Sequence, residues 1–520
     1  MHSAAPDASD PSLKATRGEW IGLAVVVLPC MVYSMDLTVL NLAIPSLTAE
    51  LRPSASQLLW IIDIYGFMVA GFLMIMGGLG DRIGRRKVLL LGAAAFAAMS
   101  ILAALSRSAQ MLILARAALG VAGATLAPST LSLIANMFRA PQERTFGVSM
   151  WISAFSAGAI IGPLVGGALI QSFGWGSVFI AGVPVMIVLL VLGPMLLPEY
   201  RDPKAGRLDI ASALLSLAAV LSFIYGLKRA AEAGFGVDSI GPMAAGVTLS
   251  ILFLRRQARL EDPLIDLALF RSRTLNMALC INILGVFFMF GSFIMLGQYF
   301  QLVAGLSPLD AGLWSTPSAI IFTVGSFATP ALARRIKAVD LLAGGLVVSA
   351  IGFVGLALAS GFYGVLLSSL LLGGFTPVIA LTTEIVVTSA PPERAGAASA
   401  LSETANELGG ALGIGVLGSL VTLIYRSKMA GVVAGLPADV AGTVAATLGG
   451  AADAVRSLPA EQAERTLSAA RNAFCVGFQT SAWLGALGLF GAALATKIAL
   501  RESRSASAAG ADQKRRSAAA

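Results

Sequence analysis

Four carboxylates and one guanidinium interrupt the long apolar runs of this 520-residue sequence. They are Asp36, Asp63, Glu403, Glu407 and Arg116. Ionisable side chains are costly inside a membrane, so those found there are candidates for substrate and proton pathways. The single histidine, His2, stands in a polar tail. We therefore expect carboxylates to carry any protons, and we expect neither a metal site nor another cofactor.

The composition indicates that most of the chain lies in a bilayer. Apolar residues make up 57% of it and charged residues only 12%, whereas soluble domains carry about 25% charged residues. This excludes a soluble enzyme. Lys and Arg (36) exceed Asp and Glu (28), and we interpret the excess as charged loops and tails at the membrane surface rather than as a nucleic-acid site.

Fourteen apolar runs reach the roughly 20 residues that a membrane-spanning helix requires. They lie near 20–44, 57–78, 87–106, 110–135, 146–170, 176–197, 210–228, 240–254, 275–301, 310–333, 339–358, 362–389, 397–424 and 473–498. No small-residue cleavage site follows the first run, so we expect it to be a retained span. The fold class is thus an all-α polytopic membrane protein.

The distribution of basic residues predicts the orientation of these spans. With the N-terminus in the cytoplasm, 26 of the 36 Lys and Arg residues fall in inner loops and tails and nine in outer loops. Lys228 and Arg229 are counted among the outer nine. Because cytoplasmic loops are enriched in Lys and Arg, both termini are expected to be cytoplasmic.

One outer loop, residues 425–472, is much longer than the others. Its sequence includes GLPADVAGTVAATLGGAADAVRSLPAEQAERTLSAARNAF, with apolar residues at helical spacing and breaks at Gly449–Gly450 and Pro459. We expect two short amphipathic helices on the outer surface. They would form either an ordered spacer or a lid over an exit.

The loop after the second span reads GGLGDRIGRRK and is the most specific motif of the chain. Its marked residues are Gly77, Asp81, Arg82, Gly84, Arg85 and Arg86. Glycine permits a tight turn between two membrane helices. The arginines are expected to pair with carboxylates at the inner rim, so that the loop acts as a conformational latch.

Two further motifs lie inside spans. Arg116 stands within LARAALGVAGA of the fourth span, and a buried arginine without a partner costs about 2.5–3.5 kcal/mol, so we expect a carboxylate beside it. The fifth span contains GAIIGPLVGG. Its residues Gly158, Gly162 and Gly166 share one helix face and predict close helix packing, while Pro163 adds a bend.

These motifs together resemble the major facilitator superfamily. GGLGDRIGRRK is similar to its signature loop, Arg116 to its fourth-span arginine, and GAIIGPLVGG to the fifth-span motif of its antiporters. Fourteen spans resemble the drug:proton antiporter branch, and MDLTVLNLAIPSL, WIIDIYGFMVAGF and ETANELGGALGIGVLGS resemble its exporters of quaternary ammonium compounds and cationic dyes. The second-half counterpart of the signature loop is degraded to PALARRIKAVD, and the tenth span lacks an acid.

The resemblance implies two six-helix halves with two intervening helices. The corresponding divisions are a cytoplasmic tail (1–19), a first half (20–198), the intervening helices with their linkers (199–273), a second half that includes the outer loop (274–498) and a cytoplasmic tail (499–520). It also implies that Asp36, Asp63, Glu403 and Glu407 are the functional acids.

Helix geometry places these groups at similar depths. Asp36 lies ~12 Å below the outer face and Asp63 and Arg116 ~9 Å below it, so Arg116 is expected to pair with one of these acids. Glu403 and Glu407 are four residues apart on one helix face. We assign proton coupling to Asp36 with Arg116, and neutralisation of the substrate cation to Glu407 assisted by Glu403.

Asp63 could serve either role, and each acid could instead belong to a structural ion pair. Two carboxylates close together cannot both ionise cheaply, so a proton and a cation can compete for one of them. The sequence therefore predicts a proton-driven efflux antiporter, monomeric in the inner membrane of a bacterium. Its expected substrates are lipophilic cations, namely quaternary ammonium compounds, dyes such as ethidium and biguanide antiseptics.

Two alternatives stay open at this point. One is an exporter of an endogenous metabolite or amphiphile with the same fold. The other is a polytopic membrane enzyme or receptor, which is disfavoured because the sequence offers no nucleophile, histidine or metal cluster and no large soluble domain.

Overall fold

The computed structural model describes residues 15–138, 140–201, 209–234, 236–260, 263, 267, 269–388 and 395–519. All regular secondary structure within these ranges is helical. Helices satisfy every backbone N–H and C=O group within their own segment, which is what a chain in lipid requires. Most of the N-terminal tail, residues 1–14, lies outside the described residues.

Thirteen helical segments of the described chain are long and apolar enough to cross a membrane. Thirteen of the fourteen expected spans correspond to them. The remaining one, near 310–333, is the 26-residue helix α12, Pro308–Ala333. Its length of about 39 Å is sufficient for a span, but residues such as Ser315, Thr316 and Ser318 lower its apolar content. The all-helical polytopic fold is therefore confirmed.

The chain divides into two compact units. The first comprises residues up to Leu264 together with Phe293–Thr316 and Ile414–Cys475. Its complete helices are α1 (Arg17–Leu51), α2 (Ala55–Ile83), α3 (Arg85–Ala104), α4 (Ala109–Gly123), α5 (Leu126–Met137), α6 (Pro141–Phe173), α7 (Ser177–Ile180), α8 (Val183–Leu196), α9 (Ile210–Ala233), α10 (Val237–Gln257), the π-helix η3 (Tyr299–Val303), α17 (Ala438–Ala446), α18 (Leu448–Ala454) and the short η6 (Val455–Ser457).

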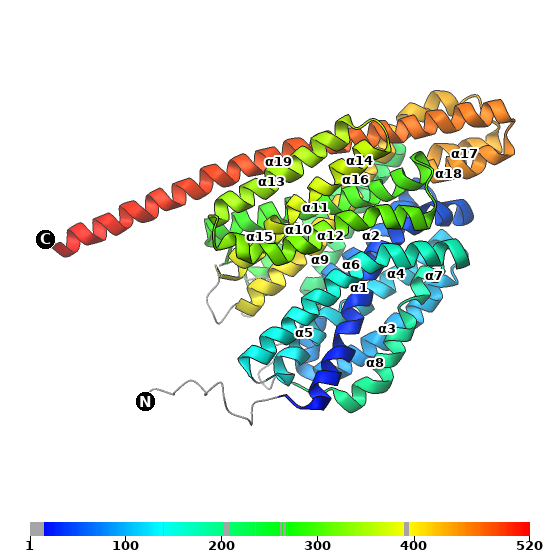
Figure 1. Cartoon of the computed structure of the whole chain (residues 1–520). Helices are drawn as coiled ribbons and strands as arrows, with labels where there is room; N and C mark the ends of the chain where they lie inside the picture. Colours follow the sequence, from blue (N-terminus) through cyan, green and yellow to red (C-terminus); the bar gives the residue numbers. More distant parts are fainter. Residues whose placement is uncertain are drawn as a thin grey trace. The chain divides into compact units, whose positions relative to one another are not determined.

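The second unit comprises Ile265–Ser292, Pro317–Gly413 and Val476–Ala520. It contains the short η2 (Leu269–Arg271), α13 (Ala338–Leu358), α14 (Phe362–Leu370), η4 (Leu371–Gly374) and α15 (Phe375–Thr388). Four long helices pass from one unit into the other, namely α11 (Arg273–Gln298), α12, α16 (Ala395–Val433) and α19 (Ala460–Ala519). Figure 1 shows all of these helices in sequence colours.

Several expected spans are built from two helical pieces. The fourth span consists of α4 and α5, and the sixth consists of α7 and α8. Within the first unit, α1 packs along α6, and α2 packs on α4 and on α9. These contacts hold the candidate acids of α1 and α2 between neighbouring helices.

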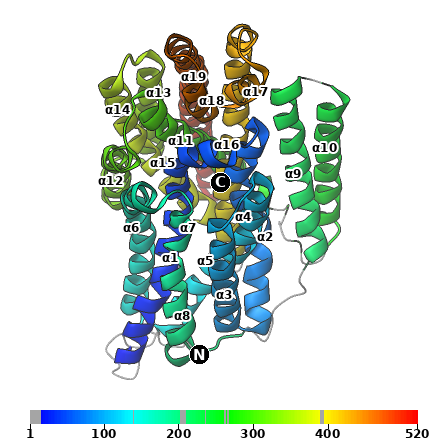
Figure 2. The ribbon, with the colours of Figure 1, turned by 90° about the vertical axis from the view of Figure 1, so that its right-hand side faces the viewer.

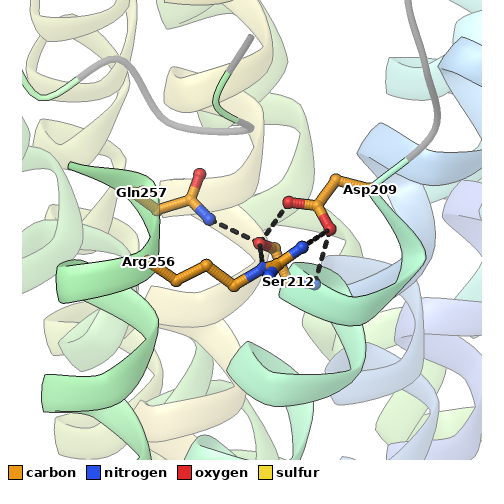
Figure 3. A network of polar contacts seen from close by, with 4 residues as sticks. All are labelled: Asp209, Ser212, Arg256 and Gln257. Atoms are coloured by element: carbon orange, nitrogen blue, oxygen red, sulfur yellow. Dashed lines mark hydrogen bonds and ion pairs between the residues drawn. The ribbon is translucent and has the colours of Figure 1, made fainter. Parts of the chain in front are cut away.

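The two intervening helices, α9 and α10, form an antiparallel hairpin, visible as the green pair in Figure 2. Gly226 lies against Ser239, and Gly246 against Phe223, so the two backbones approach closely. At the opposite end of α9, Asp209 caps the helix and accepts a 2.9 Å hydrogen bond from Arg256 of α10. Figure 3 shows this network, in which Gln257 also donates to Ser212 at 2.7 Å.

Candidate functional site

The helix that carries Asp36 is held by the glycines predicted to form a packing seam. A Cβ atom at Gly158 would collide with the carbonyl oxygen of Met31, and one at Gly166 with the side chain of Val39. Gly162 lies against Met35 and Thr38 in the same way. Only glycine permits this approach, so the seam fixes α6 on both sides of Asp36 along α1. Pro163 stands inside α6.

Asp36 is buried and faces Arg116 of α4. The Nη1 atom of Arg116 lies 3.8 Å from Oδ2 of Asp36, and both side chains are buried. The guanidinium also donates to the backbone of α2, from Nε to the carbonyl of Ile61 at 2.5 Å. The prediction that Arg116 has a carboxylate partner is confirmed, and the same arginine ties α4 to both α1 and α2.

Asp63 has a different partner, which the sequence did not reveal. The Nζ atom of Lys228, on α9, lies 2.7 Å from Oδ2 of Asp63, and both side chains are completely buried. On its other side the ammonium lies 4.1 Å from the ring centroid of Trp60. Lys228 was assigned to an outer loop, and this assignment is wrong, because α9 continues to Ala233 and carries the lysine inward.

Contacts along α9 show why Lys228 faces Asp63 of α2. Leu217 contacts Gly71 of α2, and Ile224 lies close to Gly415 of α16. Ile224 follows Leu217 by seven residues, and Lys228 follows Ile224 by four. These intervals place all three residues on one stripe of the helix. A lysine on the apolar stripe of a membrane helix requires an acid opposite it, and Asp63 is that acid.

An aromatic cluster of Tyr33, Tyr65 and Phe155 adjoins the guanidinium of Arg116 through Tyr65. Tyr33 stands one turn before Asp36 on α1, with ring centroids 5.6 Å from Phe155 and 6.2 Å from Tyr65. The guanidinium of Arg116 lies 5.2 Å from the ring centroid of Tyr65.

The signature loop joins α2 to α3 through Gly84, whose φ of +118° favours glycine. Arg85 is buried and donates to Asp81 at 2.8 Å and to the carbonyl of Pro128 at 3.3 Å. Arg86 donates to the carbonyl of Leu197 at 2.8 Å and pairs with Glu199 at 3.8 Å. The loop thus links α2, α3, α5 and the end of α8, as expected of arginines that pair with carboxylates.

The remaining residues of this motif contribute less to these links. Arg82 is exposed. A Cβ atom at Gly77 would lie 3.8 Å from Pro128, an ordinary contact, so the packing there does not require glycine.

The acids of α16 belong to a different part of the chain. Glu407 is half-buried and lies in the second unit, while the side chain of Glu403 lies outside the described residues. Beside Glu407, Asn406 accepts a 2.7 Å hydrogen bond from Asn282 of α11, and Asn282 accepts one from Thr382 of α15. This polar ladder fixes α16 at the level of Glu407. The roles of both glutamates stay predictions.

The region predicted to form a long outer loop contains two short helices, as expected, but their break is not where it was predicted. α17 ends and α18 begins at Thr447, whereas Gly449 and Gly450 lie inside α18. Gly449 instead permits close contact with Thr48 at the end of α1. Arg52 and Asp453 add an ion pair at 3.5 Å. The expected break at Pro459 does precede α19.

This chain is similar to known proteins in sequence and in fold. The family model of the Major Facilitator Superfamily matches residues 28–414. The multidrug efflux pump LfrA of Mycolicibacterium smegmatis is 40% identical over 489 residues, which are 93% of this chain and 96% of LfrA. The methyl viologen resistance protein SmvA of Salmonella typhimurium is 33% identical over 471 residues, which are 88% of this chain and 93% of SmvA.

A solved structure supports the fold independently. A bacterial homologue of the human lysosomal transporter Spinster, in an inward-facing and unoccupied conformation, matches with a TM-score of 0.64 at 17% identity. The match covers 92% of this chain and 98% of that one. At this level of identity the similarity concerns the fold alone.

Proposed function

The chain belongs to the major facilitator superfamily, as a multi-pass drug-efflux transporter and not an enzyme, and we propose that it is a proton-coupled antiporter for lipophilic cations. Its substrates are quaternary ammonium compounds, cationic dyes such as ethidium and biguanide antiseptics. The proton gradient drives export, without a cofactor, from a monomer in the bacterial inner membrane with both termini in the cytoplasm. SmvA, whose name records resistance to the dication methyl viologen, supports the choice of substrate class.

The observation that carries this proposal is the buried contact between Asp36 and Arg116. At 3.8 Å the two groups attract one another, yet Oδ2 of Asp36 and Nη1 of Arg116 have no hydrogen-bond partner among the described residues. The carboxylate oxygen is therefore available to accept a proton. Arginine stays charged in proteins, so protonation of Asp36 leaves the positive charge of Arg116 without its partner. The hydrogen bond from Arg116 to the α2 backbone changes as a result.

The surroundings of Asp36 suit an aromatic cation. Tyr33 precedes Asp36 by one turn of α1, and its ring contacts those of Tyr65 and Phe155. A ring face attracts a cation by about 0.5–2 kcal/mol, most strongly where water is excluded. On the seam side, the glycines of α6 hold the α1 backbone in place. As the helices rearrange, the proton and the substrate reach the same small region in turn.

Glu407 and Glu403 complete the proposal as acids that neutralise the substrate charge. The hydrogen-bonded ladder of Asn282, Thr382 and Asn406 supports the orientation of α16 at this level. The signature loop, with Arg85 and Arg86 in defined bonds, is proposed to release and re-form these bonds during the transport cycle.

Ethidium transport in inverted membrane vesicles tests the role of Asp36. With a pH gradient imposed, wild-type protein is expected to move ethidium, and Asp36→Asn is expected to lower the gradient-dependent rate at least about tenfold because its amide cannot ionise. Glu50→Gln is a matched control on the same helix, since Glu50 accepts a hydrogen bond from Trp175 at the far end of α1. Full gradient-driven transport by Asp36→Asn would contradict the assigned role.

The same assay separates the alternative substrate class. Glu403→Gln and Glu407→Gln are expected to slow ethidium transport while leaving uncharged amphiphiles unaffected. Unchanged ethidium transport by both variants would favour export of an endogenous metabolite or amphiphile instead.

A further inference from the structure

A site for a cation is already built into the first unit, and the chain's own lysine occupies it. The ammonium of Lys228 lies between the carboxylate of Asp63, at 2.7 Å, and the ring face of Trp60, with its centroid at 4.1 Å. A carboxylate and an aromatic face are the two groups that bind organic cations in a water-poor environment. Lys228 reaches them from the intervening helix α9, while both of its partners belong to α2.

The pair lacks the supporting hydrogen bonds that a purely structural ion pair needs. A lysine ammonium has three N–H donors. The 2.7 Å contact with Oδ2 of Asp63 engages one of them, and among the described residues no further hydrogen-bond partner is found for Nζ of Lys228 or for Oδ1 of Asp63. Two buried charges are compensated only when further hydrogen bonds satisfy them. This pair is therefore poorly compensated for its burial, and a competing cation has less to displace.

The charges facing Lys228 come from one neighbouring helix. Asp63 of α2 is its contact, and Arg116 of α4, the other charged group that acts on this carboxylate, is engaged with Asp36. On α16 the neighbour is Gly415, where a Cβ atom would lie 3.1 Å from Oδ2 of Asp63. On α10 the neighbour of this turn is Ser239, which lies against Gly226. The glycine on α16 lets that helix approach the carboxylate closely.

Building on the proposed export of cations, we propose that Lys228 is a tethered competitor of the substrate and a second proton carrier. A substrate cation that binds to Asp63 and Trp60 displaces the ammonium of Lys228. The displaced group, buried without its carboxylate, releases its proton, and –NH₃⁺ becomes –NH₂ plus H⁺. One positive charge enters the site and one leaves it. When the cation departs, Lys228 takes up a proton and returns to Asp63.

This exchange requires lysine at position 228 rather than any basic residue. Burial disfavours the charged form of an amine and can remove its proton, and lysine responds to burial in this way. A guanidinium stays protonated in proteins. An arginine at this position would hold Asp63 permanently and would exclude the substrate from the site.

Two variants, Lys228→Met and Lys228→Arg, separate this mechanism from a structural role. The competitor mechanism predicts tighter cation binding by Lys228→Met than by Lys228→Arg, and a structural role predicts the opposite. Purified protein in detergent is titrated with tetraphenylphosphonium, which has no titratable group, and a pH indicator in weak buffer reports the protons released. Lys228→Met removes the competitor, so binding at least as tight as in wild type is expected, with about one proton fewer released per bound cation. Lys228→Arg is expected to bind about tenfold more weakly or worse.

A structural ion pair would give the reverse, with Lys228→Arg close to wild type and Lys228→Met impaired. That order, or undiminished proton release by a folded Lys228→Met, overturns the proposal. If Lys228→Met does not fold, wild-type binding by Lys228→Arg still overturns it. Asp63→Asn is expected to weaken binding at least about tenfold, since the acid contact is lost. Undiminished binding by Asp63→Asn would also overturn it.

The control is Arg256→Gln, which breaks the ion pair at the other end of the same hairpin and should leave binding and proton release unchanged. A loss equal to that of Lys228→Arg would mean that the hairpin, not the lysine, controls the site, and would overturn the proposal. If wild-type protein binds no tetraphenylphosphonium and moves no ethidium, the proposed function itself fails. Normal binding and transport combined with the wrong order of variants refute only the role of Lys228.

Discussion

Two buried acid–base pairs meet at one turn of α2, and they differ in how the cation is held. Arg116 donates to the carbonyl of Ile61 and faces Asp36 across 3.8 Å. Lys228 has a short 2.7 Å contact with Asp63 and the ring of Trp60. The arginine is anchored to the backbone and only loosely to its acid. The lysine is close to its acid and, among the described residues, has no backbone anchor.

The two pairs differ in which member can change its protonation state. A guanidinium cannot lose its proton, so the first pair can respond only through its acid, Asp36. An ammonium can lose its proton, so the second pair can respond through its base, Lys228. Trp60, Ile61 and Asp63 lie within one turn of α2, so both pairs are attached to the same turn of that helix.

The largest expected difference concerns stability, and matched methionine variants reveal it. Arg116→Met removes the donor to the Ile61 carbonyl as well as the partner of Asp36, and removal of one member of a buried pair costs about 3–5 kcal/mol. We expect its unfolding midpoint in detergent to fall by about 5–10 °C. Lys228→Met orphans no backbone carbonyl, so a fall of less than half that size is expected.

Double variants provide the check on this result. Asp36→Asn should recover part of the stability lost in Arg116→Met by removing the orphaned charge, but it cannot replace the bond to the α2 backbone. Asp63→Asn should recover nearly all of the loss in Lys228→Met. Equal losses in the two methionine variants would break the comparison between the pairs.

The contrast also marks the limit of what the sequence could predict. The partner of Arg116 followed from the cost of burying arginine, because Asp36 and Arg116 stand well inside their apolar runs. Lys228 stands at the end of its run, where a lysine can equally turn outward to the membrane surface. Only the packing of α9 on α2 decides that it turns inward, and this is a tertiary contact.

Glycines gave a similar mixture of success and error. The i, i+4 spacing in α6 predicted a seam, since that spacing itself defines a helix face. In the outer loop, Gly449 and Gly450 were interpreted as a helix break, yet they lie within α18, where Gly449 faces Thr48. A glycine can end a helix or let another helix approach, and the local sequence does not distinguish the two.

Substitution of the glycines beside the two pairs is expected to have an intermediate effect, on the rate of ethidium transport. A methyl group at Gly158 would meet the carbonyl oxygen of Met31, which is backbone, whereas one at Gly71 would meet Cδ1 of Leu217 at 2.9 Å, the end of a flexible side chain. We expect Gly158→Ala to separate α6 from α1 and to slow ethidium transport about tenfold, a loss of about 1.4 kcal/mol. Gly71→Ala should slow it less than about threefold.

Gly241→Ala serves as the control because a methyl group there meets no atom within 4 Å. If Gly71→Ala proved as damaging as Gly158→Ala, the contact of α9 with α2 would be as rigid as the seam of α6. Lys228 would then have little freedom to leave Asp63, and the contrast between the two pairs would weaken.

The smallest effect is expected at the partly exposed ion pair of Asp209 and Arg256, which provides a baseline for the fully buried pairs. Burial alone would raise the pKa of Asp209, but hydrogen bonds from Ser212 and Arg256 outweigh it and hold that pKa below its usual value. An acid with a depressed pKa in the folded protein contributes stability above its unfolded pKa of about 3.9 and loses it as the pH falls.

Because Arg256 is 42% exposed, Asp209→Asn should lower the unfolding midpoint at pH 7 by only about 1–3 °C. The gap from wild type should narrow as the pH falls below about 4, because the unfolded chain then takes up a proton that folded Asp209 accepts only at lower pH. A gap that stays constant down to pH 3 would mean that the cap acts through its hydrogen bonds rather than its charge. A loss at pH 7 as large as that of Arg116→Met would remove the distinction between surface and buried pairs on which the comparison depends.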